Sequence, residues 1–192
     1  MNMRSLNIKK ILIIVLVILT LGAAYKYYKK YKGADKLKVA QVVLKPEQEL
    51  SDILNLTDAI QNGLNLKGFI AIENLSEQDY NISQFKVDVY SPANKMLIGE
   101  QTNSLQNDIV IKSKSITRLP ITFNLNIINA LALFKESGVI PQESTLWQVI
   151  THPAKYYDST HLNRLKVTLK GFVEVEGFHL DIQQSQNLYP DA

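Results

Sequence analysis

The chain has 192 residues, a formal net charge of +3 and no cysteine. This length leaves room for one membrane segment and one domain that can bury its own core. The absence of cysteine excludes disulfides, thiolate metal sites and a cysteine nucleophile. The charge is uneven, because residues 1–38 hold nine Lys or Arg and one acid, against twelve and seventeen in the remainder. The acidic remainder argues against nucleic acid as a partner, since phosphates require clustered basic residues.

An uncharged apolar run from Ile11 to Tyr25 predicts a transmembrane helix within an anchor of residues 1–32. We expect residues 8–28 to contact the lipid bilayer, because basic side chains at both ends of the run can reach the headgroups. Tyrosines interleaved with lysines behind the run are typical of a membrane interface. The predicted interface residues are Lys9, Lys10, Tyr25, Lys26, Tyr27, Tyr28, Lys29, Lys30 and Tyr31.

A cleaved signal peptide is the alternative interpretation, because Gly22-Ala23-Ala24 offers small residues for cleavage. We favour a retained anchor, since the Tyr/Lys segment has an obvious use only beside a bilayer. Basic residues lie on both sides of the run, so the charge distribution leaves open on which side of the membrane the domain lies. The sequence therefore predicts a single-pass membrane protein whose domain is either cytoplasmic or periplasmic/extracellular.

After a predicted linker at residues 33–36, residues 37–183 form the predicted domain. Apolar and polar side chains alternate along Leu64–Asn74 and again along Phe85–Tyr90. A period of two places successive side chains on opposite faces, so both segments are predicted strands of a half-buried antiparallel sheet. Further strands are expected at residues 37–44, 96–98, 109–111, 116–125, 165–175 and 178–182.

Helical spacing predicts a helix from Asn126 to Ser137, ended by Gly138. A second short helix is expected to begin at Pro141 and to end at His152-Pro153, inside an insertion at residues 139–163. Residues 47–62 are expected to form a loop with a short helix, and residues 184–192 a loose polar tail.

The insertion carries the residues most suited to contacting a partner, namely Trp147, Tyr156 and Tyr157. We favour the interpretation that they pack a small lid of the domain, with contact to a ligand or partner as the alternative. Two histidines lie nearby, but a metal site needs at least three convergent ligands, so we expect no metal and no cofactor there.

Three segments together are similar to a known family. IAIENLSEQDYNISQFKVDVYSPANKMLIGE, IVIKSKSITRLPITFNLNIINAL and LKVTLKGFVEVEGFHLDI resemble the late-embryogenesis-abundant (LEA) type 2 family, also described as LEA14-like or WHy domains. The resemblance covers most of residues 37–182. The chain departs from the family in three places: Leu75 instead of Pro follows Asn74, the loop at residues 47–62 is long, and residues 139–163 are an insertion. We expect Asn74 to bond local backbone where the chain turns.

The resemblance implies a mainly β fold, an antiparallel β-sandwich of the immunoglobulin or fibronectin-III kind with one or two short helices, without catalytic residues or cofactor. Members are associated with desiccation and stress protection, and many carry one N-terminal membrane anchor. We therefore predict a non-enzymatic, membrane-anchored domain with an interaction or stress-protective role. The alternatives are a lipid or apolar-ligand carrier at the membrane, for which the two predicted helices would cover an apolar groove, and a structural subunit of an envelope or phage-encoded assembly.

Overall fold

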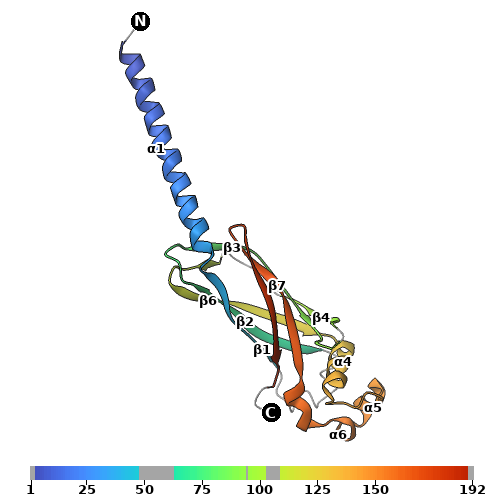
Figure 1. The fold of residues 1–192 in the computed structure, drawn as a ribbon. Coiled ribbons are helices and arrows are strands. Elements are labelled where there is room, and N and C mark those ends of the chain that lie inside the picture. Colours follow the sequence, from blue (N-terminus) through green and yellow to red (C-terminus); the bar gives the residue numbers. More distant parts are fainter. Residues whose placement is uncertain (1–2, 48–62, 94, 103–108, 190–192) are drawn as a thin grey trace.

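The computed structural model describes residues 3–47, 63–93, 95–102 and 109–189. It shows a long N-terminal helix standing on one end of a β-sandwich, with short helices at the opposite end (Figure 1). The predicted mainly β fold with one preceding apolar helix is confirmed. The short helix predicted within residues 47–62 lies almost entirely outside the described residues.

Helix α1, Met3–Ala34, is one continuous element of 32 residues. At about 1.5 Å per residue it extends roughly 48 Å. Its segment Leu12–Ala34 is long and apolar enough to cross a membrane, and the helical window that meets this test has no buried residues. Apolar side chains point outward all round the helix and are exposed. Lipid contact requires such exposure, whereas a helix in the core of a protein would have these side chains buried.

The predicted linker at residues 33–36 is shorter in the structure. Gly33 and Ala34 are buried as the last residues of α1, and only Asp35 and Lys36 separate the helix from the first strand. The Lys36 N–H donates to the Gly33 carbonyl at 3.0 Å. The helix extends to the sandwich because Gly33, which has no side chain, packs directly against it.

Two antiparallel sheets face each other across a common core. The first has the order β1-β2-β6, and the second has the order β4-β3-β7-β8 with β5 paired to the first residues of β3. The strands are β1 (Leu37–Pro46), β2 (Leu64–Asn74), β3 (Tyr80–Tyr90), β4 (Leu97–Glu100), β5 (Val110–Ile111), β6 (Ser115–Leu125), β7 (Lys166–Val175) and β8 (Phe178–Asn187).

Hydrogen bonds join the two sheets at both edges. On one side Gln101 forms an isolated bridge with Phe123, and the Thr102 N–H donates to the Thr122 carbonyl at 2.9 Å. On the other side the Gln186 side-chain amide donates to the Leu44 carbonyl at 2.6 Å. These contacts cover strand edges that would otherwise present unpaired backbone groups.

The core consists of the apolar faces predicted from the alternation. Val87 and Val89 of β3 are completely buried, as are the inward residues of the neighbouring strands. The completely buried aliphatic and aromatic residues include Leu66, Ile70, Ile72, Ile111, Leu119, Phe123, Leu125, Val167, Leu169, Val173 and Val175. Burial of these side chains, at about 1.5–3 kcal/mol each, is the main driving force for forming the sandwich.

The last strand extends beyond the predicted domain boundary at residue 183. β8 continues to Asn187, paired with β7 down to Lys166, and Leu188 is buried. The predicted loose tail at residues 184–192 is therefore wrong for its first half. The reason is that strand pairing uses backbone groups, so polar side chains on one face do not prevent it.

Among the residues that the structure describes, four short helices lie at the far end of the sandwich (Figure 1). The first predicted helix is confirmed as α4 (Ile127–Ser137), with Asn126 as its N-cap and Gly138 as its left-handed C-cap. The second predicted helix is shorter than expected: α5 (Leu146–Thr151) begins after Thr145 and not at Pro141, because Thr145 and Gln148 form a capping box. Two further helices follow, α6 (Pro153–Tyr156) and the 3₁₀ helix η1 (Ser159–Arg164).

Candidate functional site

Three strand connections surround the C-terminal end of α1, namely those between β2 and β3, β5 and β6, and β7 and β8 (Figure 1). Successive antiparallel strands run in opposite directions, so their connections lie at one end of the sandwich or the other. These three connections lie at the same end. The helix meets the domain there. We call the meeting point the stem joint and define it by Lys30, Gly33, Asn74, Tyr80, Asn81 and Glu176.

Tyr80 lies at the centre of the stem joint. It is completely buried, and its hydroxyl donates to the Lys30 carbonyl at 2.8 Å. A carbonyl oxygen can accept two hydrogen bonds, so this contact does not disturb the helix. A Cβ on Gly33 would lie 2.3 Å from the Tyr80 hydroxyl oxygen, so this contact requires glycine. Glycine and tyrosine together bring the last turn of α1 against the start of β3.

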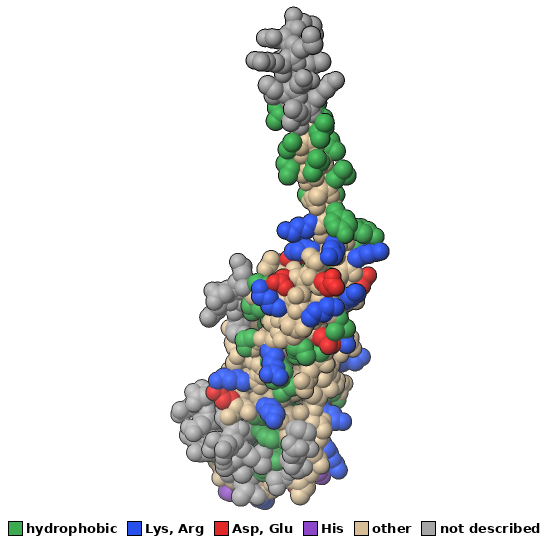
Figure 2. Space-filling view, turned by 90° about the vertical axis from the view of Figure 1, so that its left-hand side faces the viewer, with side chains coloured by type: hydrophobic (Ala, Val, Ile, Leu, Met, Phe, Trp, Pro, Cys, Tyr) green, Lys and Arg blue, Asp and Glu red, His purple; other side chains and the backbone are tan. Residues whose placement is uncertain are grey.

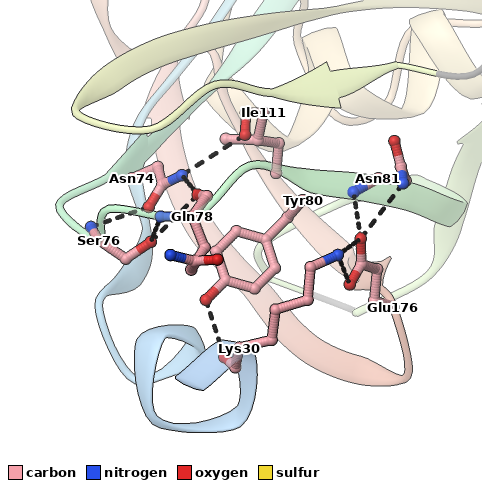
Figure 3. A network of polar contacts seen from close by, with 8 residues as sticks. All are labelled: Lys30, Asn74, Ser76, Gln78, Tyr80, Asn81, Ile111 and Glu176. Carbon is pink, nitrogen blue, oxygen red and sulfur yellow. Dashed lines mark hydrogen bonds and ion pairs between the residues drawn. The ribbon is translucent and has the colours of Figure 1, made fainter. Parts of the chain in front are cut away.

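An ion pair fastens the same helical turn to the β7–β8 hairpin. The Lys30 Nζ lies 2.6 Å from both carboxylate oxygens of Glu176, and Glu176 Oε1 also accepts from the backbone and side-chain amides of Asn81 at 3.1 and 3.2 Å (Figure 3). Glu176 and Gly177 have φ values of 49° and 88°, as in a type I′ hairpin turn. Both charged side chains are only about a quarter exposed, so this pair is screened less than an ordinary surface pair.

Asn74 holds the connections around the helix together and is completely buried. Its side-chain oxygen accepts from the Ser76 N–H at 2.9 Å, and its amide donates to the Gln78 carbonyl at 2.7 Å (Figure 3). The predicted role in bonding local backbone is therefore confirmed. The same amide also contacts the carbonyls of Lys112 and Ile111 at 3.0 and 3.4 Å. Asn74 thus links β2 to the β5–β6 hairpin, a contact that the sequence did not reveal.

Asp79 binds the β5–β6 hairpin at this end through a hydrogen bond and an ion pair. Its carboxylate accepts from the Ser113 N–H at 2.7 Å and lies 3.0 Å from the Lys112 Nζ. The Ser113 hydrogen bond and then Lys112 lower the pKa of Asp79 below its ordinary value of 3.8. The carboxylate therefore stays ionised and anchors the β5–β6 hairpin.

The predicted interface residues divide into two groups in the structure. Tyr25, Lys26, Tyr27, Tyr28 and Lys29 are exposed on α1, as a membrane interface requires, whereas Lys30 is half-buried against Glu176. The Tyr31 ring packs on Phe178 with 5.5 Å between ring centroids. Lys9 and Lys10 lie near the other end of α1. Figure 2 shows the apolar stem above a belt of basic and acidic side chains at the end of the sandwich.

The predicted partner-contact residues lie at the opposite end of the molecule. Trp147 on α5 is 72% exposed, whereas Tyr156 and Tyr157 are half-buried and pack against the core. Sequence reasoning missed Tyr189 beside Tyr157; each hydroxyl is buried without a hydrogen-bond partner in the described part of the chain. Burial raises the pKa of both tyrosines.

The apolar face of α4 is used for packing. Ala130, Leu133 and Phe134 are buried against the sandwich, where an apolar groove under the helices was the alternative expectation. A depression of about 290 Å³ lies beside α4, and Glu136 in its wall accepts from the Ala93 N–H at 2.7 Å and from the Ser91 hydroxyl. No group of three or more His, Asp or Glu placed to hold a metal ion occurs among the described residues.

Comparison with known proteins adds only remote structural likenesses. No model of a protein family matches the chain, and no curated protein matches its sequence. A protein from Archaeoglobus fulgidus matches 78% of this chain and 93% of its own at 13% identity and a TM-score of 0.40. A β-glucuronidase from glycoside hydrolase family 2 matches 80% of this chain and 13% of its own, at 8% identity and a TM-score of 0.44. A FixG-related protein from Vibrio parahaemolyticus matches 78% of this chain and 94% of its own, at 8% identity and a TM-score of 0.33.

Proposed function

We propose that this protein is a single-pass membrane protein in which α1 crosses the bilayer and holds a non-enzymatic β-sandwich of the LEA type 2 kind close to the membrane surface. The observation that carries the proposal is the stem itself. An apolar helix with large exposed side chains from Leu12 to Leu21 stands on a folded domain that leaves those side chains uncovered. Exposed apolar surface of this extent, all round one helix, is favourable in lipid and costly in water.

The stem joint supports a retained anchor over a cleaved signal peptide. Gly22, Ala23 and Ala24 lie in the middle of a continuous helix, which runs on without a break to Lys30, where it is bonded to Tyr80 and Glu176 of the sandwich. The last turns of α1 are thus part of the domain's packing. Cleavage after Ala24 would leave a short helical remnant whose tyrosines have lost their bilayer.

For the sandwich we propose an interaction or stress-protective role. The support is the LEA type 2 resemblance in the segments that form β2, β3, β6, β7 and β8. Asn74 ends β2, the first strand of the resembling pattern. It links the β2–β3 connection to the β5–β6 hairpin and does not face solvent. The exposed Trp147 on α5 is the residue best placed for a partner contact.

The anchor is tested by following both ends of the full chain in membranes. A topology reporter fused after Ala192, read together with N-terminal sequencing of the membrane-bound protein, decides whether the helix is retained and on which side the domain lies. We expect extraction by detergent but not by alkaline carbonate, with the N-terminal residues intact. Mature protein that begins near Tyr25 contradicts the proposal.

The protective role is tested with the full chain in lipid nanodiscs. A labile client enzyme is dried and rehydrated beside loaded nanodiscs or empty ones, and its aggregation and remaining activity are measured. We expect less aggregation with the protein present. A Trp147→Ser variant reports whether the exposed indole contributes, and Ile128→Ser on α4, also exposed, serves as its control. Equal client loss with loaded and empty nanodiscs rejects the protective role.

A further inference from the structure

We propose that the sandwich itself contacts the membrane, through a rim beside the stem joint that is formed by Lys36, Leu75, Lys114 and Ile116. The occupant of this surface is the headgroup layer of the bilayer that α1 crosses. The inference rests on the proposed anchoring and adds a second contact to it.

The position of the rim follows from the length of the helix. If residues 8–28 cover the hydrocarbon layer of about 30 Å, the five residues that follow, up to Gly33, add about 7.5 Å. The headgroup region on each side of a bilayer is roughly 5–8 Å thick. Gly33 already packs against Ser76 and Tyr80 of the sandwich. The end of the sandwich therefore begins where the headgroups end, with no room for an intervening water layer.

The stem joint keeps the sandwich at that height. Only Asp35 and Lys36 connect the helix to β1, and the last turn of α1 is held by Tyr80 on one element and Glu176 on another. A short connection and two separate attachments prevent the domain from swinging away as it would on a flexible linker.

Apolar side chains are exposed at this end of the sandwich. Leu75 is 46% exposed and Ile116 is 59% exposed. They belong to one corner, because Ile116 pairs with Glu73 across β2 and β6, and Leu75 follows one residue after β2 ends. The Leu75 N–H donates to the Lys36 carbonyl at 3.2 Å, and the Lys114 Nζ donates to the Leu75 carbonyl at 2.9 Å. Branched apolar side chains beside lysines are typical of surfaces that lie in the membrane interface.

The charges of this corner suit anionic lipids. Carboxylates nearby are already paired with lysines, Glu73 with Lys38 at 2.8 Å and Asp79 with Lys112 at 3.0 Å. Within the described ranges, Lys36 and Lys114 have no carboxylate within 4 Å, and the exposed Asp35 opposes them only in part. The remaining positive charge is therefore available to lipid phosphates.

The absence of cysteine allows a direct test, because one introduced cysteine becomes the only labelling site. The variants Leu75→Cys and Ile116→Cys each receive an environment-sensitive fluorophore in the full chain, reconstituted in vesicles of phosphatidylcholine and phosphatidylglycerol. Ile128→Cys is the matched control, an isoleucine 68% exposed on α4 at the far end. Leu16→Cys reports on the stem. Quenching is measured with lipids that carry a nitroxide either on the headgroup or on the acyl chain.

We expect headgroup nitroxides to quench the labels at positions 75 and 116 severalfold more than the label at 128, and acyl-chain nitroxides to quench the label at 16. Equal quenching at 75, 116 and 128, with the label at 16 still quenched, overturns the rim contact and leaves the anchor intact. A label at 16 that acyl-chain nitroxides do not reach overturns the anchoring and the rim contact with it. Adding Lys36→Glu and Lys114→Glu to the Ile116→Cys variant should reduce quenching at 116, and unchanged quenching removes the electrostatic part of the proposal.

Discussion

The two ends of the sandwich are built in different ways. At the end that receives α1, the buried polar groups are matched: Asn74 makes four contacts with backbone atoms, and the Tyr80 hydroxyl has the Lys30 carbonyl. At the far end, Ser144, Tyr157 and Tyr189 each have a buried side-chain oxygen without a partner in the part of the chain that the structure describes. That end is held by apolar packing of Val139, Ile140, Val149, Leu162 and Leu165, together with hydrogen bonds such as those that Glu136 accepts from Ser91 and Ala93.

The difference matters because hydrogen bonds are directional and apolar contacts are not. A matched polar network permits one arrangement of helix and sandwich, as the proposed fixed height of the domain over a bilayer requires. Apolar packing around hydroxyls that lack a partner among the described residues tolerates small shifts, which would suit the partner contact that we propose for the exposed Trp147. Equivalent substitutions at the two ends should therefore have unequal effects.

The largest effect is expected for Asn74→Ala. The change leaves the buried Ser76 N–H without its partner and removes the bonds to the Gln78 and Lys112 carbonyls, which keep the Ser76 and Ser115 hydroxyls. At about 1–3 kcal/mol for the unpaired N–H and about 1 kcal/mol for each other lost hydrogen bond, we expect a loss of about 3 kcal/mol or more in the free energy of unfolding. Denaturant unfolding of the full chain in detergent micelles measures it. Asn163→Ala on η1, exposed at the far end, should change stability by less than about 0.5 kcal/mol; similar losses for the two variants contradict the comparison.

Gly33→Ala should have the next largest effect. The added methyl group collides with the buried Tyr80 hydroxyl, and overpacking of this kind costs about 1–3 kcal/mol. Gly22→Ala in the same helix is the matched control, because a Cβ there meets nothing within 4 Å. Distances between spin labels on α1 and on the sandwich should broaden for Gly33→Ala and stay narrow for Gly22→Ala. Narrow distributions in both variants exclude a role for Gly33 in fixing the stem.

Removal of one tyrosine hydroxyl should change the free energy of unfolding in different directions at the two ends. Tyr80→Phe removes the hydrogen bond to the Lys30 carbonyl and should cost about 1 kcal/mol. Tyr189→Phe removes a buried hydroxyl for which the described residues offer no partner, and it should leave the free energy of unfolding unchanged or raise it slightly. Denaturation midpoints of the two variants against the native chain give both values. A larger loss for Tyr189→Phe than for Tyr80→Phe reverses the comparison.

The smallest effect concerns the pH dependence of Asp79. Its pKa is lowered in the folded protein by the Ser113 N–H and then by Lys112, so its contribution to stability is fully present above the ordinary pKa of 3.8 and is lost as pH falls through the lower, folded value. We expect native protein to be more stable than Asp79→Asn at neutral pH, with the difference shrinking as pH falls below 3.8. Thermal unfolding at several pH values measures it, and a difference that is constant with pH assigns no role to ionisation.

Much of the sandwich could be predicted because its cause is local. Alternation along β2 and β3 decides which side chains are buried, and the caps of α4, Asn126 and Gly138, lie next to the helix that they end. The predicted start of α5 was wrong. Pro141 suits a first helical turn, but the reciprocal hydrogen bonds of Thr145 and Gln148 make Thr145 the N-cap. The end of β8 was missed because pairing with β7 does not depend on the polarity of Gln184 or Gln186.

By itself the sequence determined that an apolar helix precedes an antiparallel domain, since hydropathy and a period of two are properties of neighbouring residues. Only the tertiary structure decided that the helix is fixed to the domain. Lys30 and Glu176 are 146 positions apart, and Tyr80 contacts a carbonyl 50 positions away. No local pattern specifies such pairs, because they exist only after the strands have brought three distant turns to one end. Part of the Tyr/Lys segment thus attaches the helix to the domain, and the rest is exposed on α1, where we propose that it faces the membrane.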